Sequence, residues 1–224
     1  HMFKGTSASA GIGIGKAVIV EEAELVITRN EVADAEGEIQ RFKGALEKTI
    51  AATQKMADDL ASRVGEKEAE IMQGHMMLLS DPMLTGEIEN SVRNDKVNSE
   101  FAIENVCNMY ADMFASMGDE LMQQRATDMR DIKVRMQRTL MGLESVDVSL
   151  LPKGSILVAK DLTPSMTAGI NPENVSGIVT ELGGKTSHSA ILARALEIPA
   201  VVAVNGLMDA VKAVSYTHLT LPTI

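Results

Sequence analysis

A central block of the chain, residues 31–143, has the sequence pattern of helices from end to end, and its flanks do not. The block contains 12 of the 15 methionines but only one of the six prolines, whereas the flanks hold ten of the 17 glycines. Proline interrupts helices and glycine weakens them, so this distribution favours a helical block between flanks of another kind. We therefore expect an all-α domain inserted into a domain of a different class.

Apolar residues in the block recur at spacings of three and four, the period of an amphipathic helix. Breaks at Gly65, at the Ser80-Asp81-Pro82 cap, at Asn98 or Ser99 and at Gly118 divide the block into five predicted helices. Connections this short favour antiparallel neighbours, hence a helical hairpin or bundle. Methionine at helical spacing usually fills gaps in a core, so we expect most of the methionines to be buried, among them Met109, Met113 and Met117.

The flanks carry short apolar runs that are typical of buried strands. Helical stretches that begin near Thr163 and near Ser187 separate the three runs, which are residues 155–159, 177–180 and 200–204. Strand–helix alternation is the pattern of an α/β domain, and a further strand candidate at residues 16–22 could join the same sheet. We expect this domain to be discontinuous, formed by residues 3–30 together with 144–213.

Composition excludes several classes of protein. No stretch reaches the roughly 20 apolar residues that cross a bilayer. We expect no signal segment, and His1-Met2 reads as a tag remnant. The single Cys107 excludes a disulfide framework, so we expect a cytoplasmic protein with no membrane insertion. The net charge is −10, and residues 31–143 contribute −8 of it (13 Lys+Arg against 21 Asp+Glu). This charge disfavours nucleic acid as a partner and favours a basic protein.

The segment most informative about chemistry is residues 181–194, ELGGKTSHSAILAR. Two glycines follow a buried strand and allow a tight turn, and Thr186 or Ser187 can cap the next helix, which places His188 in its first turn. The helix dipole there favours an anion and disfavours protonation of the imidazole, which leaves a ring nitrogen available as a nucleophile. A transferred phosphoryl group would find donors and positive charge on Lys185, Thr186, Ser187 and Arg194. The plainer interpretation is a histidine at a helix start with no chemical role.

Other patterns do not support a site. Gly11, Gly13 and Gly15 suggest a dinucleotide loop, but a strand-like run follows them where a helix should begin. A flexible glycine turn is the better interpretation. The four histidines have no His or Cys at ligand spacing, so no metal site is expected. A lone histidine beside an apolar run, such as His75, is more often packed in a core or on a surface than part of a site.

Residues 183–194 resemble the phosphohistidine motif of phosphoenolpyruvate-utilising enzymes. Four more segments are similar to those of enzyme I of the sugar phosphotransferase system: residues 9–17, 74–81, 125–132 and 161–167. This resemblance implies a phosphohistidine (swivelling) α/β domain with an inserted all-α hairpin or bundle.

The resemblance to enzyme I also implies an activity, that of a phosphoenolpyruvate-protein phosphotransferase. In this family the histidine that matches His188 takes phosphate from phosphoenolpyruvate and passes it to the phosphocarrier HPr, and the threonine that matches Thr167 hydrogen-bonds that histidine. The helical domain docks HPr. The docking face that the resemblance implies consists of Glu66, His75, Met77, Leu78, Asp81, Leu84 and Arg125.

The resemblance covers residues 3–213, whereas residues 214–224 do not match and are expected to be a non-native tail. Enzyme I runs on into a C-terminal domain, which is a further expected partner. We expect no cofactor in this chain, and phosphoenolpyruvate and Mg²⁺ only with that domain. Two alternatives stay open: the swivelling domain of a phosphoenolpyruvate synthase or pyruvate phosphate dikinase, which would not bind HPr, and a noncatalytic helical interaction module.

Overall fold

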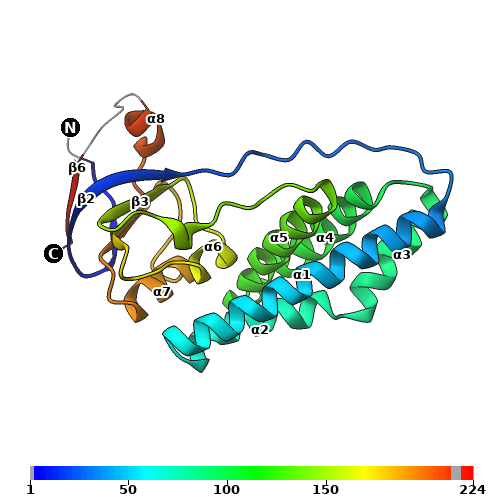
Figure 1. The fold of residues 1–224 in the computed structure, drawn as a ribbon, viewed down its shortest axis with the longest axis horizontal. Coiled ribbons are helices and arrows are strands. Elements are labelled where there is room, and N and C mark those ends of the chain that lie inside the picture. The colour runs from blue at the N-terminus through cyan, green and yellow to red at the C-terminus, as the bar shows by residue number, and fades with distance from the viewer. Residues whose placement is uncertain (1–2, 213–217, 224) are drawn as a thin grey trace. The chain divides into compact units, whose positions relative to one another are not determined.

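The computed structural model describes residues 3–212 and 218–223, with side chains up to residue 211 (Figure 1). The chain divides into two compact units, which are described separately below. The first unit takes in His1–Glu22, Leu60–Glu68 and Val146–Ile224, and the second Ala23–Asp59 and Ala69–Ser145. None of the helices that the structure describes is both long enough and apolar enough to cross a membrane.

The second unit is built from helices, as the periodicity predicts. Five helices follow one another along the chain: α1 (Ala35–Arg63), α2 (Glu66–Leu79), α3 (Pro82–Asp95), α4 (Ser99–Ser116) and α5 (Glu120–Met141). The Asp81 carboxylate caps α3 by accepting a hydrogen bond from the Met83 N–H at 2.8 Å, and Gly142 ends α5 in the left-handed region at φ 66°. Helix α4 packs against both α3 and α5 (Figure 1).

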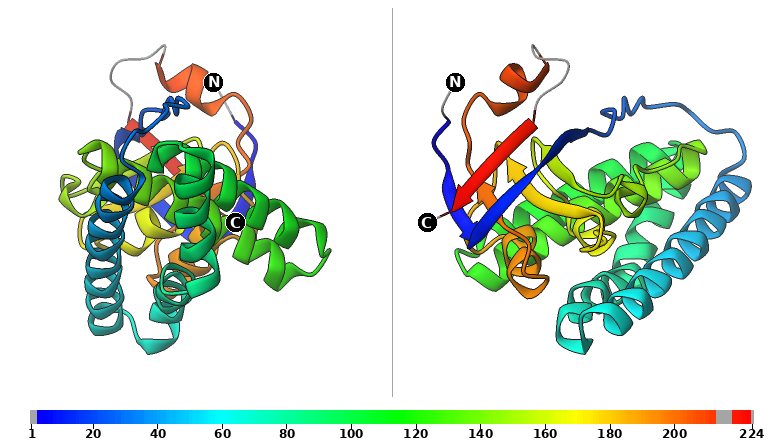
Figure 2. Two further views of the ribbon diagram at one scale, coloured as in Figure 1. Left: turned by 90° about the vertical axis from the view of Figure 1, so that its right-hand side faces the viewer. Right: turned by 60° about the vertical axis from the view of Figure 1, so that its left-hand side comes forward.

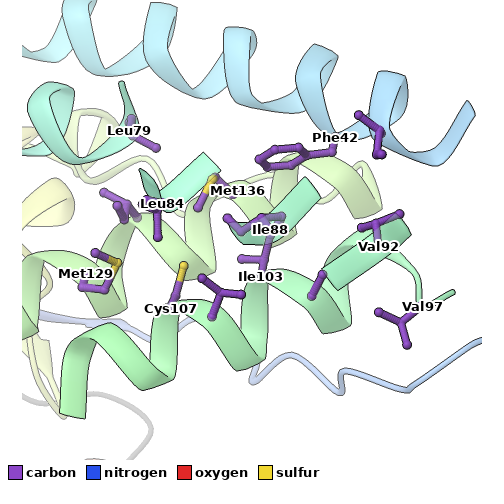
Figure 3. Close-up of a cluster of buried hydrophobic side chains, with 14 of the residues drawn as sticks. Phe42, Leu79, Leu84, Ile88, Val92, Val97, Ile103, Cys107, Met129 and Met136 are labelled. Atoms are coloured by element: carbon purple, nitrogen blue, oxygen red, sulfur yellow. The ribbon is translucent and has the colours of Figure 1, made fainter. Parts of the chain in front are cut away.

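The core of the helical unit draws apolar side chains from all five helices. Phe42 of α1, Ile88 of α3 and Ile103 of α4 are each fully buried in it (Figure 3). Met129 and Met136 extend the same cluster from α5. Burial of side chains this large contributes about 1.5–3 kcal/mol each, so this cluster is the main source of the unit's stability.

The thiol of Cys107 lies inside this core, and burial raises its pKa to about 12. Only the thiolate reacts readily with alkylating reagents, so in the folded protein Cys107 should resist iodoacetamide at pH 8. In denaturing urea the same thiol should react within minutes. Mass spectrometry of the alkylated chain checks both outcomes, and rapid labelling of the folded protein would contradict the prediction.

The expectation that most methionines are core residues is wrong. Met109, Met113 and Met117 are 54%, 44% and 54% exposed, although they follow the helical spacing of α4. The buried face of α4 is centred on Ile103 and Cys107, and the three methionines lie beside it rather than on it. Periodicity locates the apolar side of a helix but does not show how much of that side neighbouring helices cover.

The first unit is built on a mixed sheet with strand order β1-β5-β4-β3-β2-β6. Strands β2, β3, β4 and β5 are parallel neighbours, whereas β1 pairs with β5 and β6 pairs with β2 in the antiparallel direction (Figure 2). This arrangement confirms the expected α/β domain and the placement of the N-terminal strand in its sheet. The strands are β1 (Thr6–Ser9), β2 (Gly11–Val20), β3 (Ser155–Ala159), β4 (Val175–Thr180), β5 (Ala200–Val202) and β6 (His218–Thr223).

Helices cover both faces of this sheet, which explains why its central strand is apolar at successive positions. All five residues of β3 are buried. Leu157 and Ala159 pack with Ala190 of α7 (His188–Ala195), while Ile156 and Val158 pack with Leu207 of α8 (Leu207–Lys212). A short helix, α6 (Pro164–Ala168), follows β3 and contacts α7.

The glycines at the start of β2 do not form the flexible turn that we expected; they are strand residues. A Cβ added to Gly13 would lie 2.4 Å from the carbonyl oxygen of Ser176, and one added to Gly15 would lie 2.1 Å from that of Gly154. No side chain fits at such distances. These glycines therefore allow two backbone segments to approach closely, and flexibility is not their role.

The boundaries of the two units differ from the expected ones at residues 144–145, which belong with the helical unit, and at two longer segments. Residues 23–30 belong with the helical unit, where the backbone N–H of Asn30 donates to the side chain of Asn98 at 2.9 Å. Residues 60–68 belong with the first unit, where Arg63 donates to the carbonyl oxygens of Ala168 and Ile170 at 2.8 and 2.6 Å. These hydrogen bonds join segments far apart in sequence, which composition cannot reveal.

The C-terminal segment pairs with the sheet. Residues 218–223 form β6, in register from Lys16↔His218 to Gly11↔Thr223. That residues 214–224 are a non-native tail stays a prediction. The expected tag remnant at residues 1–2 lies outside the described residues.

Candidate functional site

The candidate site lies where the parallel strands β3 and β4 end. The N–H of Glu181 donates to the carbonyl oxygen of Ala159 at 3.1 Å, and that of Leu182 to Lys160 at 2.8 Å, so the pairing continues past both strands. Loops at the carboxyl edge of such a sheet are where α/β proteins bind ligands. The segment that we singled out by sequence is therefore at the expected edge.

The turn after β4 depends on Gly183, which has a φ of +100°. The hydroxyl of Thr180 closes this turn by donating to the carbonyl oxygen of Leu182 at 2.6 Å. Residues with a side chain rarely adopt a φ of this kind. Gly184, the next residue, has open space where a Cβ would stand.

These two glycines make a matched pair for mutation. Gly183→Ala forces a side chain into a disfavoured backbone conformation, and we expect it to lower the free energy of unfolding by about 1–3 kcal/mol. Gly184→Ala meets no atom within 4 Å, and we expect a change below about 0.5 kcal/mol. Urea unfolding of both variants measures the difference, and equal effects would show that the turn does not require the left-handed conformation.

Ser187 caps helix α7, as one of the two predicted capping residues. Its hydroxyl accepts from the Ala190 N–H at 3.3 Å and donates to the carbonyl oxygen of Gly184 at 2.8 Å. His188 is thus the first residue of the helix, at the positive end of the helix dipole. Its ring is half-buried, and the Nδ1 atom of the ring is inaccessible.

The side chains that we expected to surround His188 have different environments. Lys185 and Thr186 are exposed at the turn and are available to an anion. Arg194 instead holds the loop in place, because its Nη1 donates to the carbonyl oxygens of Lys185 at 3.0 Å and Ala8 at 2.9 Å. The guanidinium thus links α7 to β1 and to the glycine turn.

Thr167 lies on α6, which contacts the helix that His188 begins. The side chain is 2% exposed, and its hydroxyl donates to the carbonyl oxygen of Thr163 at 2.8 Å. Because its proton is used there, the hydroxyl can act toward an imidazole only as an acceptor. A hydrogen bond between Thr167 and His188 remains a prediction.

Two acidic residues at this edge were missed by the sequence reasoning. Asp161 follows β3, and burial raises the pKa of its carboxyl, while the Leu162 N–H that donates to it acts in the opposite direction. Glu181 follows β4 and accepts from the Met208 N–H at 2.9 Å, which holds the start of α8. Their position directly after buried strands was the available signal.

The residues that the resemblance assigned to a docking face are not all on the surface. Met77 is 69% exposed, Glu66 is exposed, and Leu78 and Asp81 are half-buried. Arg125 retains 30% exposure of its side chain. Glu66 belongs to the first unit, whereas Met77, Leu78, Asp81 and Arg125 belong to the helical unit, and we call these four residues the docking face. The structure places all five residues at accessible positions.

His75 and Leu84 cannot contact a partner directly, because they are 0% and 2% exposed. Leu84 belongs to the apolar core of the helical unit. His75 Nε2 lies 3.1 Å from an oxygen of Asp128, so this histidine is packed in the interior of the helical unit. Helical spacing put both residues near the docking face but could not distinguish the surface from the layer beneath it.

Among the residues that the structure describes, no three His, Cys, Asp or Glu side chains gather in a way that would hold a metal ion.

Comparisons with known proteins bear on both units. Residues 4–125 match the family described as PEP-utilising enzyme, N-terminal, and residues 151–220 match PEP-utilising enzyme, mobile domain. The phosphoenolpyruvate-protein phosphotransferases of Listeria monocytogenes and Bacillus subtilis are 44% and 42% identical to the chain over 199 residues. In each case the match covers 89% of this chain and 35% of the relative, so the chain spans about a third of their length.

Two solved structures are also similar to this chain. An NMR structure of enzyme I (nEIt) superposes with a TM-score of 0.80 at 38% identity, covering 93% of this chain and 85% of that one. The N-terminal domain of a second protein, Enzyme 1 - Nitrogen, superposes with a TM-score of 0.62 at 26% identity, covering 90% and 83%.

Proposed function

Because the chain belongs to the PEP-utilising enzymes, and within them to enzyme I, we propose that it is a phosphoryl relay that carries phosphate on His188. In this proposal His188 receives the phosphoryl group that originates from phosphoenolpyruvate and passes it to the phosphocarrier HPr. The proposed activity is that of a phosphoenolpyruvate-protein phosphotransferase, the name that the relatives carry.

The observation that carries this proposal is the placement of His188 as the first residue of α7, after a glycine turn at the carboxyl edge of the sheet. A helix start stabilises an anion, and an imidazole with an accessible nitrogen is a good nucleophile. Because Nδ1 is inaccessible, Nε2 is the proposed phosphoryl acceptor. The exposed Lys185 and Thr186 would contact the phosphoryl oxygens, with Ser187 and Arg194 keeping the turn and the helix start in position.

The transfer step with HPr conserves charge and atoms. The lone pair of His188 Nε2 attacks phosphorus, the N–P bond of the donor phosphohistidine breaks, and its electron pair stays on the donor ring. One proton passes through solvent from the new imidazolium to the donor imidazole. Chemistry of this kind needs positioning and electrostatic stabilisation more than it needs further reactive groups. Thr167, as an acceptor for a proton on Nδ1, would keep Nε2 unprotonated.

Phosphoenolpyruvate and Mg²⁺ are assigned to the part of the relatives that lies beyond the span of this chain. That part would bind phosphoenolpyruvate and is a second partner of the phosphohistidine unit. In this proposal the half-reaction with HPr uses the residues of this chain.

HPr is the proposed partner of the docking face. Met77 offers exposed apolar area, Leu78 is half-buried, and Asp81 offers negative charge to a basic partner. Glu66, an exposed carboxylate of the first unit, is a further proposed contact. The charge of −8 over residues 31–143 favours such an encounter from a distance. His75 and Leu84 take part only by supporting this face from beneath.

Incubation of this chain with HPr that carries a ³²P-labelled phosphoryl group tests the proposal. We expect the label to appear on this chain and to return to unlabelled HPr when that is added in excess. An NMR titration with unphosphorylated HPr runs beside it. Binding without transfer would favour the noncatalytic interaction module, and neither binding nor transfer would favour the swivelling domain of a synthase or dikinase.

A further inference from the structure

A buried pair of polar residues joins two helices directly beneath the docking face. His75 of α2 is fully buried, with its Nε2 3.1 Å from Oδ1 of Asp128 on α5. A carboxylate only accepts hydrogen bonds, so Nε2 carries the proton in this contact. On the other side of the ring, Nδ1 lies 4.0 Å from a carboxylate oxygen of Asp131. Such a polar contact in an apolar core costs desolvation free energy and is better suited to orienting groups than to adding stability.

Asp128 connects this buried histidine to the surface. Its second carboxylate oxygen, Oδ2, lies 3.8 Å from Nη1 of Arg125, one helical turn earlier in α5. Asp128 itself is 5% exposed, whereas the side chain of Arg125 is 30% exposed. One carboxylate therefore contacts a fixed imidazole with one oxygen and attracts a surface guanidinium with the other.

Gly74, the neighbour of His75, provides the space for this guanidinium. A Cβ added to Gly74 would stand 2.6 Å from Nη1 of Arg125 and 3.5 Å from its Cζ. Glycine within a helix costs about 1 kcal/mol relative to alanine. Gly44 of α1 has nothing within 4 Å of its Cβ position, so it shows no such packing requirement.

We propose that Gly74, His75 and Asp128 are positioning residues that hold the guanidinium of Arg125 at the docking face, ready to hydrogen-bond with HPr. The inference rests on the proposed docking of HPr. An arginine held in advance loses less side-chain freedom on binding than a free one, and its planar group presents several donors in a fixed geometry. His75 thus acts on HPr binding through Asp128 and Arg125 without contacting HPr.

Gly74→Ala is the sharpest test, because the atom that it displaces is the far end of a flexible side chain. We expect HPr to bind this variant about 10-fold more weakly. Its melting temperature should stay at or above that of the unchanged protein, since alanine favours the helix. Arg125→Ala should weaken binding by a similar factor, and the double variant should bind within about two-fold of Arg125→Ala alone. Gly44→Ala is the matched control and should leave binding unchanged.

Two further measurements report on positioning. The Nε–H resonance of Arg125 in ¹⁵N–¹H spectra should shift in Gly74→Ala but not in Gly44→Ala, with no HPr present. His75→Gln keeps an N–H for Asp128 and should bind HPr more tightly than His75→Ala. Additive losses in the double variant, or an unmoved Arg125 resonance, would overturn the inference. If Arg125→Ala binds HPr as tightly as the unchanged protein and still exchanges phosphate, the inference about Arg125 is overturned and the proposed relay stands. If the unchanged protein exchanges no phosphate with HPr, the relay itself is contradicted.

Discussion

Replacement of His188 by alanine should abolish the transfer of phosphate from phosphorylated HPr, by a factor on the order of 10⁴ or more. The loss should be this large because the exposed neighbours cannot replace the imidazole: Lys185 carries a primary amine and Thr186 an unactivated hydroxyl. His75 cannot compensate, because it is fully buried in the other unit. Rapid-quench measurement of ³²P on the chain gives the rate for both proteins.

The His188→Ala variant should otherwise be unaffected. The ring is half-buried and Ser187, not His188, caps the helix, so the melting temperature should change by only a few degrees. Affinity for unphosphorylated HPr should persist, because the docking face belongs to a different unit. Labelling of the variant at the rate of the unchanged protein would show that the phosphoryl acceptor is another residue.

Truncation of Leu84 to alanine should cost about 2–5 kcal/mol of unfolding free energy, the usual range for a buried leucine. Leu84 is 2% exposed and packs in the core of the helical unit, where truncation leaves a cavity. Met77, 69% exposed on α2, is the matched comparison, and Met77→Ala should change stability by less than about 0.5 kcal/mol. Urea unfolding followed by circular dichroism measures both.

The two substitutions should affect HPr affinity in the reverse order to their effects on stability. Met77→Ala should weaken binding through lost apolar contact, with no change in the urea midpoint. Leu84→Ala should weaken binding only under conditions where the helical unit begins to unfold. A stable Leu84→Ala variant with poor affinity would contradict this expectation and show that Leu84 shapes the docking face as well as the core.

The helices could be predicted from the sequence because local residues determine their ends. The Asp81 carboxylate and Pro82 start α3, and Gly142 ends α5, each through contacts within a few residues. The buried strands were equally predictable, since β3 is covered on both faces and four of its five residues are apolar. In each of these cases the cause lies within the segment.

Features caused by distant segments could not be predicted. Gly13 and Gly15 resemble a turn until Ser176 and Gly154 are known to face them. Met109 follows the same spacing as buried residues of α4, and only the arrangement of neighbouring helices leaves it exposed. The depth of a side chain below a surface depends on these long-range contacts.

In the candidate site, too, features that depend on neighbouring residues could be predicted, and those that depend on distant segments could not. Ser187 and His188 could be placed at a helix start from their neighbours alone. The engagement of Arg194 with the carbonyl oxygen of Ala8, 186 positions away, could not. A charged side chain in a motif is as consistent with holding a loop as with contacting a phosphoryl group, and only the partner atoms decide.

The pairing of β2 with β3 sets an order of events during synthesis. These two parallel neighbours are separated in the chain by the whole helical unit, since β2 ends at Val20 and β3 begins at Ser155. The helical unit depends mainly on contacts between consecutive helices, which form quickly. On a ribosome it can therefore fold first, while β2 waits without its partner strand. The first unit would become complete only after strands β3 to β6 have emerged, which makes it the later of the two units to form.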